Sequence, residues 1–275
     1  LYVIDETNLE THGSWMRNGK KDIIEDTLPN DHEEWQDIIL DRAKSMFERD
    51  KNHAAILIWS CGNESCGGKD LYVMSEYFRH ADPTRLVHYE NIFWDRRYNG
   101  TSDMESQMYP TVASIKKFLA EHRDKPFICC EYTHAMGNSI GGMHKYTDLT
   151  DEEPLYQGGF IWDFVDQAIW HKDRYGKDAL AYGGDFGDRP NDGNFSGDGI
   201  LFADRKLTTK MQEVKFNYQN FDLDVTAEKV TIHNKSLFTD VAAYELHLEL
   251  MLDGKVIWES SSDAPHILPG ETGTV

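Results

Sequence analysis

The sequence contains only four cysteines in 275 residues, and their spacing gives no common zinc site. Cys61 and Cys66 are separated by four residues, while Cys129 and Cys130 are adjacent, a combination that matches no usual zinc pattern. Adjacent residues of a strand point to opposite faces, so we expect free thiols that pack as small hydrophobic side chains. Free thiols favour a reducing compartment, and the expected location is the cytoplasm.

Positive charge is also scarce. Lysine and arginine number 28 against 48 aspartates and glutamates, which gives 28 − 48 = −20. Nucleic acids and anionic membranes need clustered basic residues, so neither is expected as a partner. No apolar run reaches the roughly 18 residues of a membrane-spanning helix. No Gly-x-Gly-x-x-Gly follows a predicted strand, and residues 134–142 lack the Lys-Ser/Thr ending of a phosphate-binding loop.

An initiator methionine and a signal peptide are both missing from the start of the chain. The first residues, Leu1 to Ile4, already read as part of a strand. We therefore expect the chain to be a fragment of a longer protein.

Short apolar runs alternate with helical patterns over the first two-thirds of the chain. The predicted strands are 1–6, 54–62, 85–91, 106–110, 126–132 and 158–166. Helices are predicted over 31–50, 70–82 and 111–124, the first with Trp35, Ile38, Ile39, Ala43, Met46 and Phe47 on one face. Buried strands separated by crossover helices indicate a parallel α/β sheet.

Polar or aromatic residues stand at the end of every predicted strand. They are Asp5-Glu6, Asn63-Glu64, Glu90-Asn91, Tyr109, Glu131 and Asp163. Such residues at the carboxyl ends of successive parallel strands favour a (β/α)8 TIM barrel over a doubly wound sheet, which binds ligands at one switch point. Six of the eight strands are found, and we expect the first two to precede Leu1.

A different pattern follows residue 170. Residues 182–206 are rich in glycine and aspartate and predict a long ordered loop. Alternating segments at 229–235, 242–252 and 255–261 then indicate antiparallel strands, with a hairpin signal at Asp253-Gly254. The predicted domains are a catalytic barrel over 1–206, lacking its first two strands, and an incomplete immunoglobulin-like β-sandwich over 207–275.

Two glutamates, Glu64 and Glu131, each end an apolar strand. On one barrel both would face the same basin, where paired carboxylates suit glycosidic cleavage as acid and nucleophile. Either glutamate alone is more simply interpreted as a solvated strand end. The pair, with Asn63 beside Glu64 and aromatic residues nearby, favours catalysis.

Other candidates are less specific by spacing. Glu10 and His12 share one face of an extended segment and could hold a divalent cation, but taken alone the segment is better explained by a loop histidine bonded to the backbone. Tyr109 could hydrogen-bond a neighbouring carboxylate, and His134 could reach a sugar hydroxyl. Sugars stack on aromatic rings, and the candidate platforms are Trp59, Trp94, Trp162, Phe164 and Trp170.

Five ordered segments resemble the large bacterial β-galactosidases of glycoside hydrolase family 2. They are LYVIDETNLETHG, ILIWSCGNES, CEYTHAMGNSIGG, QGGFIWDFVDQ and YGGDFGDRPNDGNFSGDGILFADR, between residues 1 and 206. The resemblance implies a retaining hydrolase of terminal β-galactosides such as lactose, with Glu64 as acid/base and Glu131 as nucleophile. It also implies a homo-oligomeric parent enzyme.

The resemblance assigns further roles by position. Glu10, His12 and Glu64 match the magnesium ligands, and Asn63, Tyr109, His134 and Trp162 match substrate contacts. The family also binds sodium through a backbone carbonyl and an amide side chain. Phe195 matches the carbonyl, but Asp198 stands where an asparagine is expected, and a carboxylate can still bind sodium.

Two alternatives stay open. Another family 2 hydrolase, a β-glucuronidase or β-mannosidase, would share the carboxylate pair, but a glucuronidase needs basic residues aimed at the substrate carboxylate. A non-catalytic sugar-binding fragment would bind galactose without turnover.

Overall fold

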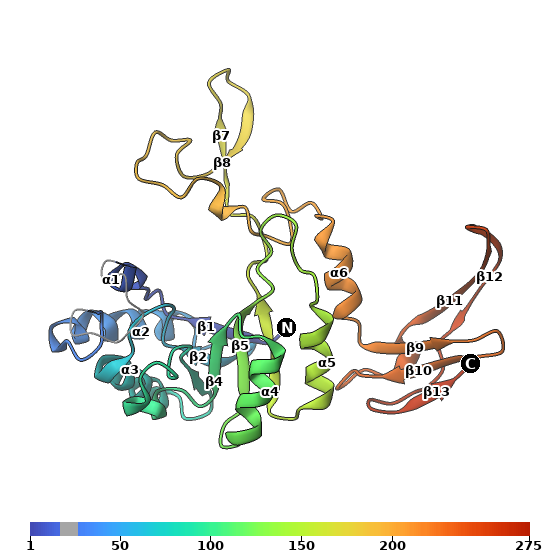
Figure 1. Ribbon diagram of the computed structural model, residues 1–275, viewed down its shortest axis with the longest axis horizontal. Coiled ribbons are helices and arrows are strands. Elements are labelled where there is room, and N and C mark those ends of the chain that lie inside the picture. Colours follow the sequence, from blue (N-terminus) through green and yellow to red (C-terminus); the bar gives the residue numbers. More distant parts are fainter. Residues whose placement is uncertain (17–26) are drawn as a thin grey trace. The chain divides into compact units, whose positions relative to one another are not determined.

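A computed structural model describes residues 1–16 and 27–275 of the chain (Figure 1). The chain divides into two compact units, Leu1–Glu213 and Val214–Val275.

The first unit alternates strands and helices. Its strands are β1 (Val3–Glu6), β2 (Ile56–Ser60), β3 (Leu86–His88), β4 (Glu105–Met108), β5 (Phe127–Tyr132), β6 (Tyr156–Ile161), β7 (Ile169–Lys172) and β8 (Asp178–Ala181). Its helices are α1 (His12–Met16), α2 (Gln36–Asp50), α3 (Gly68–Ala81), α4 (Val112–Glu121) and α5 (His144–Glu152), and α6 (Lys210–Asn217) crosses into the second unit. Short 3-10 helices are η1 (Glu33–Trp35), η2 (Arg96–Thr101) and η3 (Gly193–Ser196).

Six parallel strands form two sheets, β1-β2-β3 and β4-β5-β6. The sheets are joined where β3 meets the start of β4, because Asp103 donates its N–H to the carbonyl of Val87 at 2.8 Å. His88 Nε2 also lies 2.8 Å from Ser106 Oγ, which links β3 to β4 through side chains. The prediction of an α/β unit with parallel strands is confirmed. Within the described residues no ladder joins β6 to β1, so the strands do not form a closed barrel.

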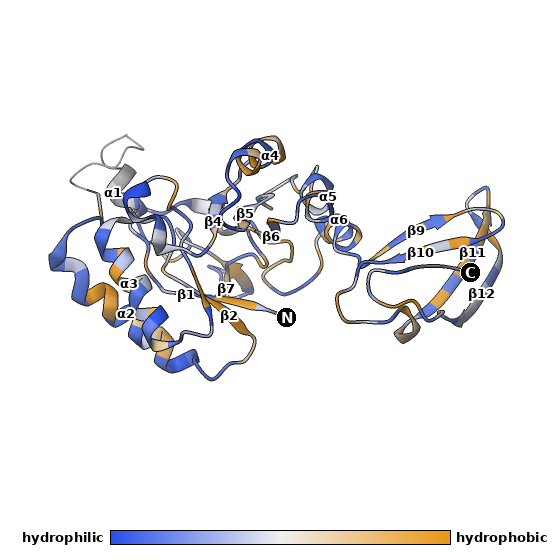
Figure 2. Ribbon diagram, turned by 90° about the horizontal axis from the view of Figure 1, so that it is seen from below, coloured by the Kyte–Doolittle hydropathy of each residue, from blue (hydrophilic) through white to orange (hydrophobic). Residues whose placement is uncertain are grey.

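The core of this unit lies where α2 and α3 pack on β2 and β3. Trp59 of β2 is fully buried, stacks on Phe78 of α3 at 5.9 Å and meets Phe47 of α2 edge-on at 5.4 Å. Figure 2 shows hydrophobic residues along β1 and β2 and on parts of α2 and α3. The predicted apolar face of the first helix is too wide. Trp35 and Ile38 are 39% and 50% exposed, because only one stripe of a helix can face the sheet.

Beyond β6 the first unit contains little regular structure. The antiparallel hairpin β7–β8 was not predicted, since all four residues of β7 are exposed and carry no buried face. Residues 182–206 form the predicted loop, interrupted only by η3.

The second unit consists of short antiparallel strands. They are β9 (Phe221–Val225), β10 (Val230–Asn234), β11 (Glu245–Leu252), β12 (Lys255–Asp263) and β13 (Thr272–Thr274), with the 3-10 helix η4 (Val241–Ala243). One sheet has the order β13-β10-β9, and β11 pairs with β12 across the predicted Asp253-Gly254 turn, where both residues have positive φ. A small core around Val230, Ile232 and Ile267 includes the partly buried Leu246 and Leu248 of β11.

Among the helices of the described residues, none has the length and apolar character to cross a membrane.

Candidate active site

Three glutamates lie at the carboxyl ends of parallel strands. Glu64 follows β2, Glu90 follows β3, and Glu131 is the penultimate residue of β5. The charges of Glu64 and Glu131 both raise the pKa of Glu90, and the charge of Glu64 raises the pKa of Glu131. The structure therefore brings the predicted pair into one electrostatic cluster, with Glu90 as a third member.

Glu64 is held by both its backbone and its side chain. Its N–H donates to Glu90 Oε1 at 2.9 Å, and its Oε2 lies 3.9 Å from His12 Nδ1. Burial raises the pKa of the Glu64 carboxyl above its ordinary value, while His12 lowers it and Glu10 raises it. A carboxyl group that keeps its proton toward neutral pH is suited to act as a general acid.

Tyr109 makes hydrogen bonds to both the side chain and the backbone of Glu131. The Tyr109 hydroxyl donates to Glu131 Oε2 at 2.5 Å, and the Tyr109 N–H donates to the Glu131 carbonyl at 2.8 Å. The predicted bond from Tyr109 to a neighbouring carboxylate is confirmed. Burial raises the pKa of Glu131, and the Tyr109 bond partly opposes that effect by stabilising the charged form.

Residues at the same strand ends also have an unusual backbone conformation. Glu64, Tyr109 and Thr133 have φ values of 36°, 50° and 47°, in the left-handed region that residues other than glycine rarely adopt. Such conformations persist where the surrounding structure over-determines them, and they concentrate at functional sites.

The loop after β1 lies against Glu64. Glu10 pairs with Asn63 in an isolated parallel bridge, and Asn63 donates its N–H to the Leu9 carbonyl at 2.9 Å. This pairing places Glu10 beside Asn63, and His12 of the same loop is the residue whose Nδ1 lies 3.9 Å from Glu64 Oε2. Two carboxylates and an imidazole suit a divalent cation. Only the His12–Glu64 pair is close, however, and in the described part of the chain the three ligand atoms do not converge on one point.

The segment after β5, the 3-10 helix η3 and the end of β4 bring other candidates together. The ring of His134 lies 6.0 Å from the rings of both Tyr109 and Phe195. His134 Nδ1 accepts the Met136 N–H at 3.3 Å, so the neutral ring carries its proton on Nε2, which is then a donor. Trp162 accepts the Ala135 N–H at its carbonyl.

Asp198 presents an unsatisfied buried oxygen. The carboxylate is 2% exposed and its Oδ2 accepts the Trp162 indole N–H at 3.0 Å, but Oδ1 is buried with no hydrogen-bond partner among the described residues. Asp163 Oδ1 is in the same state, and the charge of Asp198 raises the pKa of Asp163. Two unsatisfied acidic oxygens favour a bound cation, because burying unpaired negative charge is costly.

One candidate platform is wrong. Trp59 is fully buried in the core, so its ring cannot stack on a substrate. The sequence indicates Glu90 only as a polar residue at the end of a predicted strand. Its bond to Glu64 depends on which strands become neighbours, and the spacing of residues does not reveal that.

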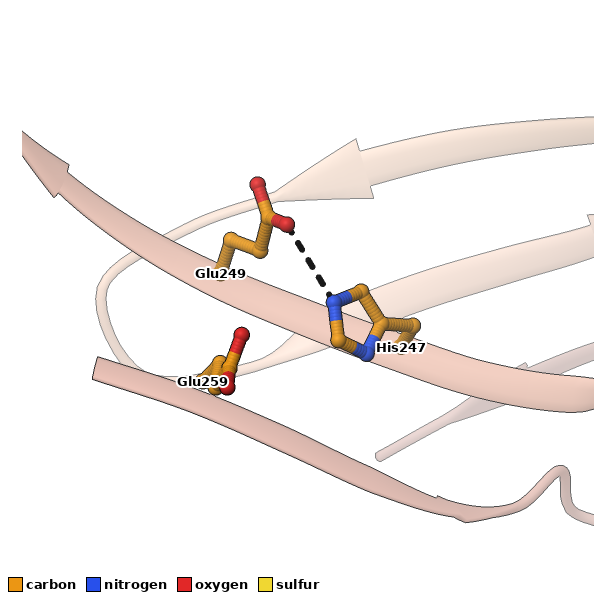
Figure 3. Close-up of side chains that lie close together, drawn as sticks. All are labelled: His247, Glu249 and Glu259. Atoms are coloured by element: carbon orange, nitrogen blue, oxygen red, sulfur yellow. Dashed lines mark hydrogen bonds and ion pairs between the residues drawn. The ribbon is translucent and has the colours of Figure 1, made fainter. Parts of the chain in front are cut away.

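A separate set of ligand-type atoms lies on the β11–β12 hairpin of the second unit (Figure 3). His247 Nε2 is 3.2 Å from Glu249 Oε1, and Glu249 stands opposite Glu259 across the two strands. All three residues are exposed. Water can solvate each of them, so we assign no metal site to these three residues.

Parallel strands that present carboxylates at their carboxyl ends define a class of α/β domain on which glycoside hydrolases are built. A family model described as "Glycosyl hydrolases family 2, TIM barrel domain" matches residues 1–223. A second, described as "Beta-galactosidase, domain 4", matches residues 230–275. The chain belongs to glycosyl hydrolase family 2.

The similar curated proteins are named β-galactosidases. One from Halalkalibacterium halodurans is 56% identical over 96% of this chain and 26% of its own length. One from Clostridium acetobutylicum is 53% identical over 94% of this chain and 28% of its own length. The chain thus spans about a quarter of the length of these relatives.

Solved structures resemble the chain at the level of fold. A β-glucuronidase from an uncultured Clostridium has a TM-score of 0.52 and 19% identity, covering 79% of this chain and 40% of the other. A β-glucuronidase of Bacteroides uniformis has a TM-score of 0.50 and 14% identity, covering 90% of this chain and 34% of the other. These values support a shared fold and carry no information on substrate.

Proposed function

We propose that this chain provides the catalytic carboxylates of a β-galactosidase that cleaves terminal β-galactosides with retention of configuration. The observation that carries the proposal is the cluster at the strand ends, in which Glu90 accepts the Glu64 N–H, the Tyr109 hydroxyl donates to Glu131, and burial and then the charge of Glu64 raise the pKa of Glu131. The substrate class is taken from relatives that are named β-galactosidases.

The reaction proceeds as a double displacement. Glu64 gives its proton to the glycosidic oxygen while the Glu131 carboxylate attacks the anomeric carbon, so the carbon–oxygen bond breaks and the aglycone leaves as an alcohol. Glu64, now ionised, takes a proton from water. That water attacks the anomeric carbon and releases Glu131, which regenerates both carboxyl groups. The mechanism requires the two carboxyl groups to lie about 5–5.5 Å apart.

The neighbouring side chains bind and orient the sugar. His134 Nε2–H and the Asn63 side chain act as hydrogen-bond partners for galactose hydroxyls, and the Trp162 ring lies beneath the apolar face of the sugar. Tyr109 holds Glu131 in place for attack. Binding energy of this kind places the anomeric carbon next to the nucleophile.

Two sets of side chains have the donor chemistry of a cation site. Glu10, His12 and Glu64 would hold magnesium, whose charge would stabilise the ionised form of Glu64 after proton transfer. The Phe195 carbonyl and Asp198 would hold sodium, and the unsatisfied Oδ1 of Asp198 supports this assignment. Asp163, with its own unsatisfied oxygen, adds a second carboxylate to that site.

The proposed function implies a barrel domain followed by a sandwich domain. The six parallel strands of residues 1–206 are the last six strands of a proposed eight-stranded barrel. Residues 207–275 are part of an immunoglobulin-like sandwich. The parent enzyme is a homo-oligomer that acts in the cytoplasm.

A β-glucuronidase is the main competing function. The charges that act on Glu64, Glu90 and Glu131 come from other glutamates and from His12, which is a poor environment for a substrate carboxylate. Measuring kcat/KM for the nitrophenyl galactoside and the nitrophenyl glucuronide would separate the two. A preference for the glucuronide would refute galactoside specificity.

The assignment of roles is tested by azide rescue in a graft that replaces the homologous segment of the Halalkalibacterium halodurans relative with this chain. Glu64→Gly and Glu131→Gly should both lose turnover of dinitrophenyl galactoside. With azide, the Glu64 variant should yield β-galactosyl azide by intercepting the intermediate, and the Glu131 variant should yield the α-azide by direct attack. Exchanged anomers would reverse the roles, and turnover unaffected by either change would refute them.

A further inference from the structure

Glu90 is the most deeply buried carboxyl group of the strand-end cluster. It lies two residues beyond β3 and is 2% exposed, whereas the Glu64 side chain is 29% exposed. A substrate cannot contact a group so enclosed. Its role must therefore act through the residues that it touches.

The contact of Glu90 is with the backbone of Glu64. Glu90 Oε1 accepts the Glu64 N–H at 2.9 Å, and Glu64 has a φ of 36°. Glu64 lies beyond the end of β2, and the acceptor of its N–H is this side chain. Glu90 supplies that acceptor at the residue whose side chain is proposed to deliver the proton.

The location of Glu90 is electrostatically unfavourable for a group that serves only packing. It lies within range of the charges of Glu6, Glu64 and Glu131, and its own charge acts on Cys130 in β5. Burying a carboxyl group among other carboxylates costs free energy that a leucine or methionine would avoid. A carboxyl group that is buried despite this cost indicates a functional constraint.

We propose that Glu90 is a positioning residue that holds the backbone of Glu64 in its left-handed conformation and so aims the Glu64 carboxyl at the leaving-group oxygen. This inference rests on the proposed function, because it assumes that Glu64 is the acid. Glu90 itself touches neither the sugar nor the reacting atoms.

The variants needed are Glu90→Gln and Glu90→Leu in the graft described above. Glutamine keeps an oxygen that can accept the Glu64 N–H, while leucine keeps the bulk and removes the acceptor. Glu105→Gln is the matched control. This substitution alters another buried carboxylate, which lies at the amino end of β4 and pairs with Arg96. The position is away from the carboxyl ends of the strands, where the candidate site lies.

The kinetic measurement is kcat/KM with a poor leaving group, methyl galactoside, and with a good one, dinitrophenyl galactoside. Misplacing the acid should lower kcat/KM of Glu90→Leu about 100-fold for the methyl substrate and less than about tenfold for the dinitrophenyl substrate, which departs without protonation. Glu90→Gln should stay within about tenfold of wild type for both. Glu105→Gln should not change the ratio between the substrates.

A second measurement reads the geometry without turnover. Hydrogen exchange of peptides that contain Glu64 should be faster in Glu90→Leu and near wild type in Glu90→Gln. Equal losses for the two substrates in Glu90→Leu, or unchanged exchange at Glu64, would overturn the proposal. If the wild-type graft turns over no galactoside, the proposed function fails, and the exchange result then decides alone whether Glu90 positions Glu64.

Discussion

Tyr109 bonds Glu131 through a backbone that lies in the left-handed region. Its φ is 50°, and its hydroxyl donates to Oε2 of Glu131 at 2.5 Å. A hydrogen bond to the ionised form stabilises a carboxylate against protonation. Tyr109 therefore keeps the proposed nucleophile charged as well as oriented.

Tyr109→Phe is predicted to lower activity most strongly at low pH. Without the hydroxyl, the pKa of Glu131 rises further, so the acidic limb of kcat/KM moves to higher pH. Losing a hydrogen bond to a charged group should reduce kcat about 10- to 100-fold at the optimum. A pH–rate profile tests this, and an acidic limb that stays in place would show that Glu131 does not govern it.

His88 lies beneath the candidate site in a chain of buried polar side chains. Its Nδ1 is 2.9 Å from Ser60 Oγ, its Nε2 is 2.8 Å from Ser106 Oγ, and Ser60 donates to Glu6. Burial lowers the pKa of His88 to about 4, so the ring is neutral at ordinary pH. This chain ties β1 through β4 together just below the strand ends.

The stability contribution of His88 should depend on pH. Its folded pKa lies below the unfolded value of about 6.5, so the unfolded state binds the proton first and stability falls as pH drops from about 6.5 to 4. Urea unfolding of wild type and His88→Gln should show their difference shrinking by about 3 kcal/mol over that range. Buried carboxyls such as Glu90 act with the opposite sign in both proteins and cancel in the difference. A difference independent of pH would contradict the burial of a neutral ring.

Glu64 and Glu131 could be proposed from the sequence because each ends an apolar run, a signal that lies within a few residues. Tyr109 was found in the same way. The bond between Glu64 and Glu90, and the unsatisfied oxygens of Asp163 and Asp198, could not be found, because they depend on contacts between segments 26 to 35 residues apart.

The segment after β2, which positions Glu64, depends on Gly62. Gly62 has a φ of 132°, and an added Cβ would lie 2.7 Å from the Leu9 carbonyl oxygen and 2.9 Å from Leu9 Cβ. The neighbouring Asn63 uses that carbonyl as its acceptor. The end of β2 and the loop after β1 therefore approach so closely that only glycine fits.

Gly62→Ala should separate the two segments. We expect a loss of about 1–3 kcal/mol in the free energy of unfolding, from strained backbone and the clash with Leu9. The activity of the graft should fall with it, because Asn63 and Glu64 follow directly. Gly141→Ala is the matched control, since an added Cβ there meets nothing within 4 Å. Equal stability of the two variants, measured by thermal unfolding, would contradict this account.

Long amphipathic helices and buried strands were predictable because their apolar residues follow a regular period. Helix α5, with one buried residue, gives only a weak signal. The three-residue strand β13 and the exposed strand β7 give none. Such elements take their structure from pairing and not from a local pattern.

At the scale of the whole chain, β1 and β6 each have one partner strand within the described residues. Unpaired backbone groups along such edges can form hydrogen bonds with strands of other chains. We expect the isolated chain to show little or no galactosidase activity, since the proposed barrel and its pocket are incomplete. Turnover by the chain alone, abolished by Glu131→Gln, would overturn that expectation while supporting the assignment.

The most direct test of the central claim is covalent trapping of the nucleophile in the active graft. A galactosyl fluoride that carries a second fluorine in place of the hydroxyl next to the anomeric carbon should form a long-lived ester with the attacking residue. Mass spectrometry of peptides should then find the sugar on Glu131 and not on Glu64. A label on any other residue, or turnover without a label, would contradict the proposed mechanism.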